Sequence, residues 1–293
     1  MAQTEDVPHT RATLQDIIGR IHTVPSLPEV VTEVCRLVNE PSANAAHISG
    51  IMVKDAAMAA KMLRMVNSVY YGLKEPVRDL EAATRILGFK TIRSIALSIS
   101  VINAFQQQSA NFNMKAFWAH SAVTACLCRL VAAKAKLCDP ELGFTIGLLK
   151  DVGKLILVEN APDELRAIIA VAREYRMAFH KAAHEVLDTD DAQVGAWLME
   201  HWGMEPTIVN TVRDQFDLAQ AADPQAGKLV AMCVFAEYLC ALKKIRVSGN
   251  CDEPRLDPLV FGHLGLDKSA LVEVMTVIND EVDNARQLLQ LAG

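Results

Sequence analysis

Apolar residues recur at the helical period along most of this chain. After the start signal at residues 26–29, Val30, Val31, Val34 and Leu37 are spaced three and four apart, which predicts a helix with one buried face. No segment alternates apolar and polar residues with period two, and no Asn-Gly or Asp-Gly pair separates two apolar runs. The pattern therefore predicts an all-α protein.

The first clearly polar connector is the stretch QQQSANFN at residues 106–113. We place a boundary there and expect two packed helical subdomains. Residues 1–108 form the first, and residues 109–293 form a helical bundle with a C-terminal helical extension. No repeat of 20–50 residues is evident, so a solenoid is not expected.

The most informative stretch runs from residue 117 to residue 159 and reads as two apolar helices joined by a Cys-Asp-Pro turn. His120 lies near the start of the first helix. Lys150 and Asp151 close an apolar run in the second helix. The intervening chain is long enough for the second helix to fold back on the first, so His120 is predicted to face the Lys-Asp pair across an antiparallel packing.

Composition narrows the class of protein. Hydrophobic residues make up 51% and charged residues 22%, which is enough apolar material for a sizeable core. The net charge of −6 and the lack of a basic cluster disfavour nucleic-acid binding. The seven cysteines show no C-x-x-C spacing and are expected to be reduced, buried thiols of a cytoplasmic protein. We expect no secretion signal in residues 1–10 and no apolar run approaching a membrane span of roughly 18 residues.

Six stretches, taken in order, resemble the HDOD family, the HD-related output domain of bacterial signalling proteins. They are VPSLPEVVTEVCRLVNEP, MVKDAAMAAKMLRMVNSVYYG, ATRILGFKTIRSIALSISV, FWAHSAVTA, IGLLKDVGKLIL and DAQVGAWLMEHWGMEP. The resemblance extends from about Ile17 to about residue 215. It implies a fold related to the HD-domain phosphohydrolases, whose metal site contains a first-helix histidine, a His-Asp pair and a distant aspartate.

Carried over by position, this resemblance matches His120 to the first histidine and Asp151 to the aspartate of the pair. Lys150 stands where the histidine of the pair would be, and Asp191 stands where related sequences often carry a further histidine. The distant aspartate has no assigned counterpart. A lysine ammonium has no lone pair for a cation, so we expect a degenerate site with no metal and no cofactor. Lys150 then either supplies the positive charge itself, at Asp151 or Asp191, or extends to solvent. Taken alone, His120 could also be a core histidine that is hydrogen-bonded to the backbone.

The N-terminal motif of the resemblance contains Asp55, Asn67 and Ser68. Capping by Asp55 and a helix-end clamp by Asn67 and Ser68 explain these residues without a ligand, and contact with a partner or ligand is the alternative. Tyr70 and Tyr71 are candidate interface residues, because each combines apolar area with a polar tip.

The resulting prediction is a non-catalytic, free-standing bacterial signalling module that acts through a signalling protein partner. The sequence identifies neither this partner nor whether the chain forms a homo-oligomer. A groove is expected near His120, Lys150 and Asp191. Two alternatives remain open: a metal-dependent phosphohydrolase with atypical ligands, and a sensor that binds a nucleotide without cleaving it. Serine-hydrolase, zinc-protease, phosphate-loop and dinucleotide motifs are not found in the sequence.

Overall fold

The computed structural model describes residues 11–292 except 23, 38–39, 41, 106–108, 221–222, 248 and 253–254. The predictions for residues 1–10 and for part of the first polar connector fall outside this description. The predicted all-α class is confirmed. The first group of elements is β1 (Ala12–Thr13), α1 (Leu14–Gly19), α2 (Glu29–Leu37), α3 (Ala45–Met52), α4 (Ala56–Val66), the 3-10 helix η1 (Val69–Tyr71), α5 (Leu80–Leu87) and α6 (Phe89–Ala104).

The second group begins after the polar connector. It comprises α7 (Met114–Ala135), α8 (Pro140–Leu149), α9 (Gly153–Asn160), α10 (Pro162–Glu174), α11 (Phe179–Val186), β2 (Leu187–Asp188), α12 (Asp191–His201), α13 (Pro206–Arg213), the 3-10 helix η2 (Leu218–Gln220), α14 (Pro224–Leu242), α15 (Pro258–Leu264) and α16 (Lys268–Ala292). Several predicted helix ends are set by local chemistry. Thr13 and Asp16 form a capping box at the start of α1. As predicted, Asp55 caps α4 and accepts a 2.9 Å hydrogen bond from the amide of Met58.

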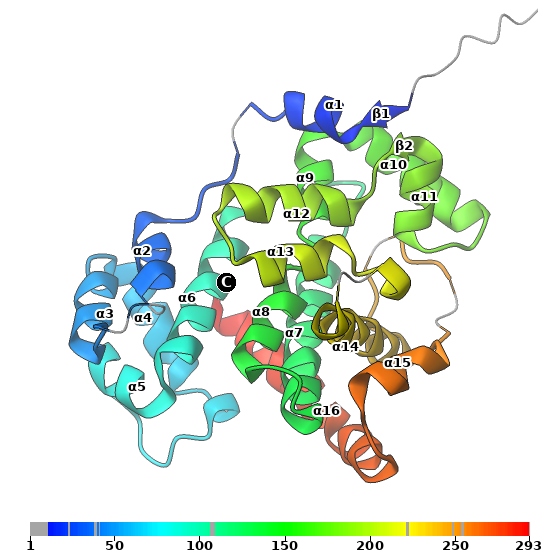
Figure 1. Ribbon diagram of the computed structural model, residues 1–293. Helices are drawn as coiled ribbons and strands as arrows, with labels where there is room; N and C mark the ends of the chain where they lie inside the picture. Colours follow the sequence, from blue (N-terminus) through cyan, green and yellow to red (C-terminus); the bar gives the residue numbers. More distant parts are fainter. Residues whose placement is uncertain are drawn as a thin grey trace, which may run out of the picture.

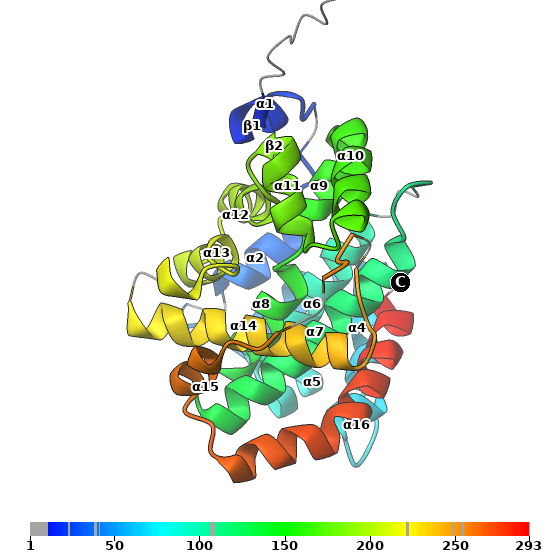
Figure 2. The ribbon, with the colours of Figure 1, turned by 90° about the vertical axis from the view of Figure 1, so that its right-hand side faces the viewer.

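The two groups lie beside each other and the C-terminal helix runs between them. Helices α2 to α6 form one side of the molecule, and α7 and α8 occupy its centre (Figure 1). Helix α16 packs along α7 and also contacts α4 and η1 (Figure 2). The N-terminal strand β1 pairs in parallel with β2, which places α1 next to α10 and α11, away from α2. The boundary at residue 108 stays a prediction.

Two local expectations from the sequence differ from the structure. The β1–β2 pair was not predicted, because two residues per strand are too few to show a period of two. The helical pattern of residues 89–105 places Arg93 on the exposed side with Lys90. In the structure Arg93 is 8% exposed and forms a 2.9 Å ion pair with Glu205 at the start of α13. The buried guanidinium thus ties the first group of helices to the second.

Two helices are long and apolar enough to cross a membrane by length and composition alone, contrary to the sequence expectation. They are α7, with 67% of its most apolar window buried inside the protein, and α14, with 56%. This is weak evidence, because the core helix of a soluble protein passes the same test. Both helices pack on each other and on α8.

Close contact between α7 and α8 depends on a glycine. A Cβ atom at Gly147 would lie 2.7 Å from the carbonyl oxygen of Thr124 and 2.8 Å from the Cα atom of Ala125. The absence of a side chain lets the two backbones approach, as small residues do at helix interfaces generally. This approach brings the C-terminal end of α8 towards the N-terminal half of α7, where His120 lies.

Candidate functional site

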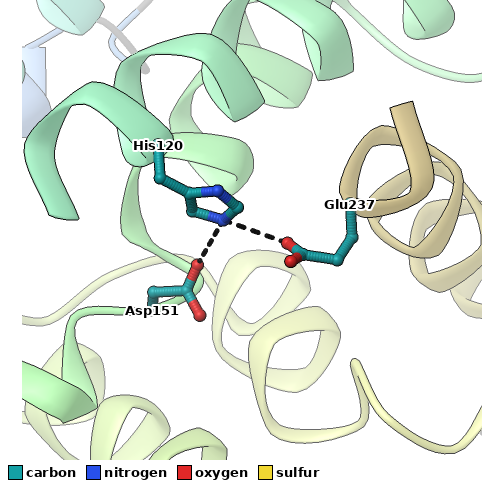
Figure 3. A group of neighbouring side chains, drawn as sticks. All are labelled: His120, Asp151 and Glu237. Atoms are coloured by element: carbon teal, nitrogen blue, oxygen red, sulfur yellow. Dashed lines mark ion pairs between the residues drawn. The ribbon is translucent and has the colours of Figure 1, made fainter. Parts of the chain in front are cut away.

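His120 and Asp151 meet at the α7–α8 crossing, as the spacing predicted. His120 is fully buried, and its Nε2 atom lies 3.4 Å from Oδ2 of Asp151 and 3.0 Å from Oε2 of Glu237 on α14 (Figure 3). The other ring nitrogen, Nδ1, lies 3.2 Å from the carbonyl oxygen of Ile245. Two carboxylates and one carbonyl therefore surround the imidazole, an arrangement that suits a doubly protonated ring donating from both nitrogens.

Lys150 contacts the same two carboxylate oxygens as the imidazole. Its Nζ atom lies 2.6 Å from Oδ2 of Asp151 and 2.9 Å from Oε2 of Glu237. Lys150 is 3% exposed, so the alternative that it extends to solvent is wrong. The ammonium is buried among the acidic groups of the site.

A second lysine extends the cluster towards α12. Lys154 on α9 donates to Oδ1 of Asp151 and lies 2.5 Å from Oδ2 of Asp191. Asp191 is fully buried and contacts Lys154, while Lys150 contacts Asp151 and Glu237. The cluster contains three carboxylates, two ammonium groups and one imidazole, so it is electrically neutral when His120 is protonated.

The turn between α8 and α9 positions these side chains. Helix α8 ends at Leu149, and the Gln215 side chain donates a 2.6 Å hydrogen bond to the carbonyl oxygen of Lys150, one of the acceptors left free at a helix end. Asp151 lies in the turn, and Lys154 follows in the first turn of α9. On the opposite side, the Asn250 amide donates to Oε1 of Glu237 at 3.3 Å and orients that carboxylate.

Mutual attraction within the cluster outweighs the cost of burial. Burial disfavours the charged form of Lys150, but Asp151 and Glu237 raise its pKa well above the usual value. Burial likewise opposes ionisation of Asp151, but Lys150 and Lys154 hold its pKa well below the usual value. For His120, burial lowers the pKa, while Glu237 and Asp151 more than compensate and raise it to about 9. His120, Lys150 and Asp151 are therefore expected to be charged at neutral pH.

The raised pKa of His120 predicts a loss of stability at alkaline pH. The stabilisation is fully present below the unfolded pKa of about 6.5 and is lost as pH rises through about 9. The pKa difference corresponds to roughly 3 kcal/mol of unfolding free energy. Urea unfolding of the wild type and of His120→Gln between pH 6 and pH 10 checks this. The advantage of the wild type should shrink with pH; a constant difference would contradict the assignment.

A cavity of about 220 Å³ opens beside the cluster. Lys150, Asp151, Lys154 and Glu237 line its inner end. Residues of α11 and α14 and of the segments that follow α13 and α14 form its other walls. It corresponds to the groove expected near His120, Lys150 and Asp191, except that His120 and Asp191 are fully buried and do not line it.

The residues singled out in the N-terminal motif serve local structure. Asn67 forms two hydrogen bonds with the backbone of Val77, at 2.8 and 2.9 Å, and so closes the loop after α4. Tyr70 and Tyr71 pack edge to face with ring centroids 4.9 Å apart, and the Arg129 guanidinium lies 5.1 and 5.7 Å from them. The part of the helix-end clamp that was predicted for Ser68 is wrong, because its Oγ atom is buried and has no hydrogen-bond partner among the described residues. None of these residues lies at the buried cluster, and their contact with a partner stays a prediction.

Sequence reasoning missed two members of the cluster. Glu237 supplies the distant carboxylate that could not be assigned, and it is a glutamate on α14 rather than an aspartate. An acidic residue within the apolar run of residues 224–242 was the available signal. Lys154 was also missed, although a lysine three residues after Asp151 in an apolar helix indicates a buried ion pair.

A helical bundle with a buried histidine and carboxylates at the crossing of two central helices defines a protein of the HD-related class. Comparison with known protein families identifies the family within this class. Residues 24–218 match the HDOD domain, and the chain belongs to this family. The predicted family is thereby confirmed.

The similar solved structures share this fold. An HDOD domain protein of unknown function from Geobacter sulfurreducens superposes with a TM-score of 0.82 at 21% identity, covering 94% of this chain and 96% of that one. A "Putative phosphohydrolase" from Shewanella amazonensis SB2B gives 0.72 at 23% identity, with 93% and 97% covered. A "Putative signal transduction protein" from Marinobacter aquaeolei VT8 gives 0.75 at 20%, with 92% and 60% covered.

One curated relative also matches. It is an "Uncharacterized protein" of Treponema pallidum (strain Nichols), 23% identical over 224 residues. The match covers 75% of this chain but only 42% of the length of that relative. Together, the comparisons assign the chain to the HDOD family and show that it shares its fold with proteins described as a "Putative phosphohydrolase" and a "Putative signal transduction protein".

Proposed function

We propose that this chain is a non-catalytic regulatory module, in which the ammonium of Lys150 takes the place of the metal ion of an HD phosphohydrolase. One observation carries the proposal. Lys150 Nζ lies within 2.9 Å of Oδ2 of Asp151 and Oε2 of Glu237, the two carboxylate oxygens that also face the His120 imidazole. The cation position between these ligands is filled by the chain itself.

A metal ion does not fit this donor set in the observed state. His120, Asp151 and Glu237 offer three ligand atoms within 4.8 Å of one another, which is the observation that favours a phosphohydrolase as the second candidate. A divalent ion there would have to displace an ammonium that binds two of the three ligands, and it would need a deprotonated His120. Lys150 adds like-charge repulsion at short range. These requirements favour the regulatory function over the enzyme.

Restoring the histidine should restore cation binding. In Lys150→His, the repelling ammonium is replaced by an imidazole, and the histidine-aspartate pair of the HD site is complete. We expect this variant to bind Mn²⁺ at least tenfold more tightly than the wild type does, in line with the roughly 10–100-fold effects of residues that support metal ligands. Isothermal titration calorimetry with MnCl₂ measures the difference.

Lys150→Met is the matched control for Lys150→His, because it removes the charge without adding a ligand.

Hydrolysis of bis-p-nitrophenyl phosphate by the wild type in Mn²⁺ tests the proposed non-catalytic function itself, and no turnover is expected. Turnover by the wild type that Asp151→Ala abolishes would establish the phosphohydrolase instead.

We further propose that the module acts by binding a signalling protein through the η1 turn. Two observations support this: Val69 in η1 is 79% exposed, and the surrounding turn is held by the Asn67 clamp and the Tyr70–Tyr71 pair. Val69→Asp should reduce capture of a specific partner from native cytoplasm by about tenfold, as loss of an apolar contact at an interface centre does. Val272→Asp, at a 58% exposed position on α16, is the control. Equal capture by both variants would argue against this surface.

A further inference from the structure

Two stacked aromatic rings line the cavity beside the charge cluster. The rings of His180 and Phe216 stack with centroids 3.8 Å apart and an angle of 11° between their planes. Burial lowers the pKa of His180 to about 4, so this imidazole is neutral near pH 7. Phe216 is 37% exposed, so its ring is not fully covered by the protein. A planar ring that enters the cavity can therefore stack on Phe216.

Two arginines that line the same cavity have no carboxylate partner among the described residues. Arg246 is half-buried, and its one hydrogen bond within the described part of the chain runs from Nη1 to the carbonyl oxygen of Asp252 at 2.5 Å. Arg255 is exposed, and no carboxylate of the described residues lies within ion-pair distance of either guanidinium. Every buried lysine of the cluster, in contrast, contacts two carboxylates. The arginines thus leave planar donor groups available to an anion.

The charges lining the cavity favour a single negative charge. Among the described lining residues, four cationic side chains (Lys150, Lys154, Arg246 and Arg255) face three carboxylates (Asp151, Glu237 and Asp252), which leaves one positive charge in excess. His120 and Asp191, buried behind this lining, add one charge of each sign and do not change the balance. A monoanion would neutralise the cavity, whereas a dianion would overcompensate it.

Its volume sets the size of the ligand. At about 220 Å³, the cavity exceeds an apolar cavity of roughly 150 Å³ that admits benzene, but it is smaller than the roughly 300–1,000 Å³ typical for drug-sized ligands. One ring with one anionic substituent fits this space. A dinucleotide does not.

We propose that the cavity binds a small planar monoanion of the aromatic carboxylate class, with its carboxylate at Arg246 and Arg255 and its ring on Phe216. This ligand site rests on the proposed regulatory function, because the ligand would be bound without being turned over. The module would then report the concentration of this ligand through the segment after α14, which carries Arg246 and Arg255.

Calorimetric titration of the full chain with benzoate tests this proposal. We expect saturable binding at one site, at least tenfold weaker binding of benzamide, which lacks the charge, and no measurable binding of acetate, which lacks the ring. Phenyl phosphate, a dianion at pH 8, should bind no more tightly than benzoate. Arg246→Gln and Arg255→Gln should each weaken benzoate binding about tenfold, the effect of losing one charge-assisted hydrogen bond.

Arg286→Gln, on the exposed surface of α16, is the control and should bind benzoate as the wild type does. Because Arg246 also bonds to backbone, thermal unfolding of each variant establishes that it is folded, and the exposed Arg255 provides an independent variant. Unsaturable benzoate binding, equal binding of benzamide, tighter binding of phenyl phosphate, or unchanged affinity in both arginine variants would overturn the proposal. Metal-dependent turnover with intact benzoate binding would overturn the proposed function alone.

Discussion

Replacing Lys150 by methionine should cost the protein about 3–5 kcal/mol of unfolding free energy, the range seen when one partner of a buried ion pair is removed. Methionine has nearly the same length, so packing changes little. The loss is electrostatic, because the buried carboxylates of Asp151 and Glu237 would lose the ammonium group that contacts both of them. Urea unfolding at pH 7 measures the effect.

Two controls separate this electrostatic loss from a general effect of substitution. Lys90→Met removes an ammonium that is 58% exposed and pairs with Asp139 at 2.8 Å, and it should cost no more than about 1 kcal/mol. Adding Glu237→Gln to Lys150→Met should recover part of the loss, because it removes the one carboxylate charge that is then in excess. A loss at Lys150 no larger than at Lys90 would contradict the view that the ammonium holds the cluster together.

The second large effect is expected at Gly153, the first residue of α9. A Cβ atom there would fall well inside van der Waals contact with the carbonyl oxygen of Asp191, and 2.6 Å from the amide nitrogen of Gly195. Both are backbone atoms, so neither can move without displacing α12. Gly153→Ala should therefore cost more than about 4 kcal/mol and separate Lys154 from Asp191.

A matched control is Gly50→Ala in α3, where a Cβ atom would meet nothing within 4 Å. Alanine at this helical position should leave stability unchanged or raise it by up to about 1 kcal/mol. Chemical unfolding measures the free energy of unfolding of the two variants. Similar values would show that α9 and α12 can separate without a loss of stability.

The sequence was sufficient to predict the α7–α8 crossing because both of its determinants are local. Helical periodicity defined the two helices, and the short turn made them antiparallel, so His120 and Asp151 could be paired by spacing. Caps such as Asp55 were predictable for the same reason, since the hydrogen bond spans three residues. The family resemblance then supplied the significance of the lysine beside Asp151.

The remainder of the site depends on packing between distant segments. Glu237 reaches the cluster because α14 packs on α7. Its place in an apolar run indicates that it is buried, but no local pattern indicates which residues it will contact. Arg93 was misplaced for a related reason: on an amphipathic helix a charged residue normally faces solvent, but its partner Glu205 comes from the other group of helices. Tertiary contacts of this kind override the local preference.

The central claim is that the ammonium of Lys150 occupies the cation position between His120, Asp151 and Glu237. Anomalous diffraction from wild-type crystals soaked in MnCl₂ tests it most directly, because the map locates bound manganese without reference to activity. We expect no anomalous peak among these three side chains, and electron density for Lys150 Nζ between the two carboxylates. A manganese peak coordinated by Nε2 of His120 and by Asp151, with Lys150 turned away, would contradict it.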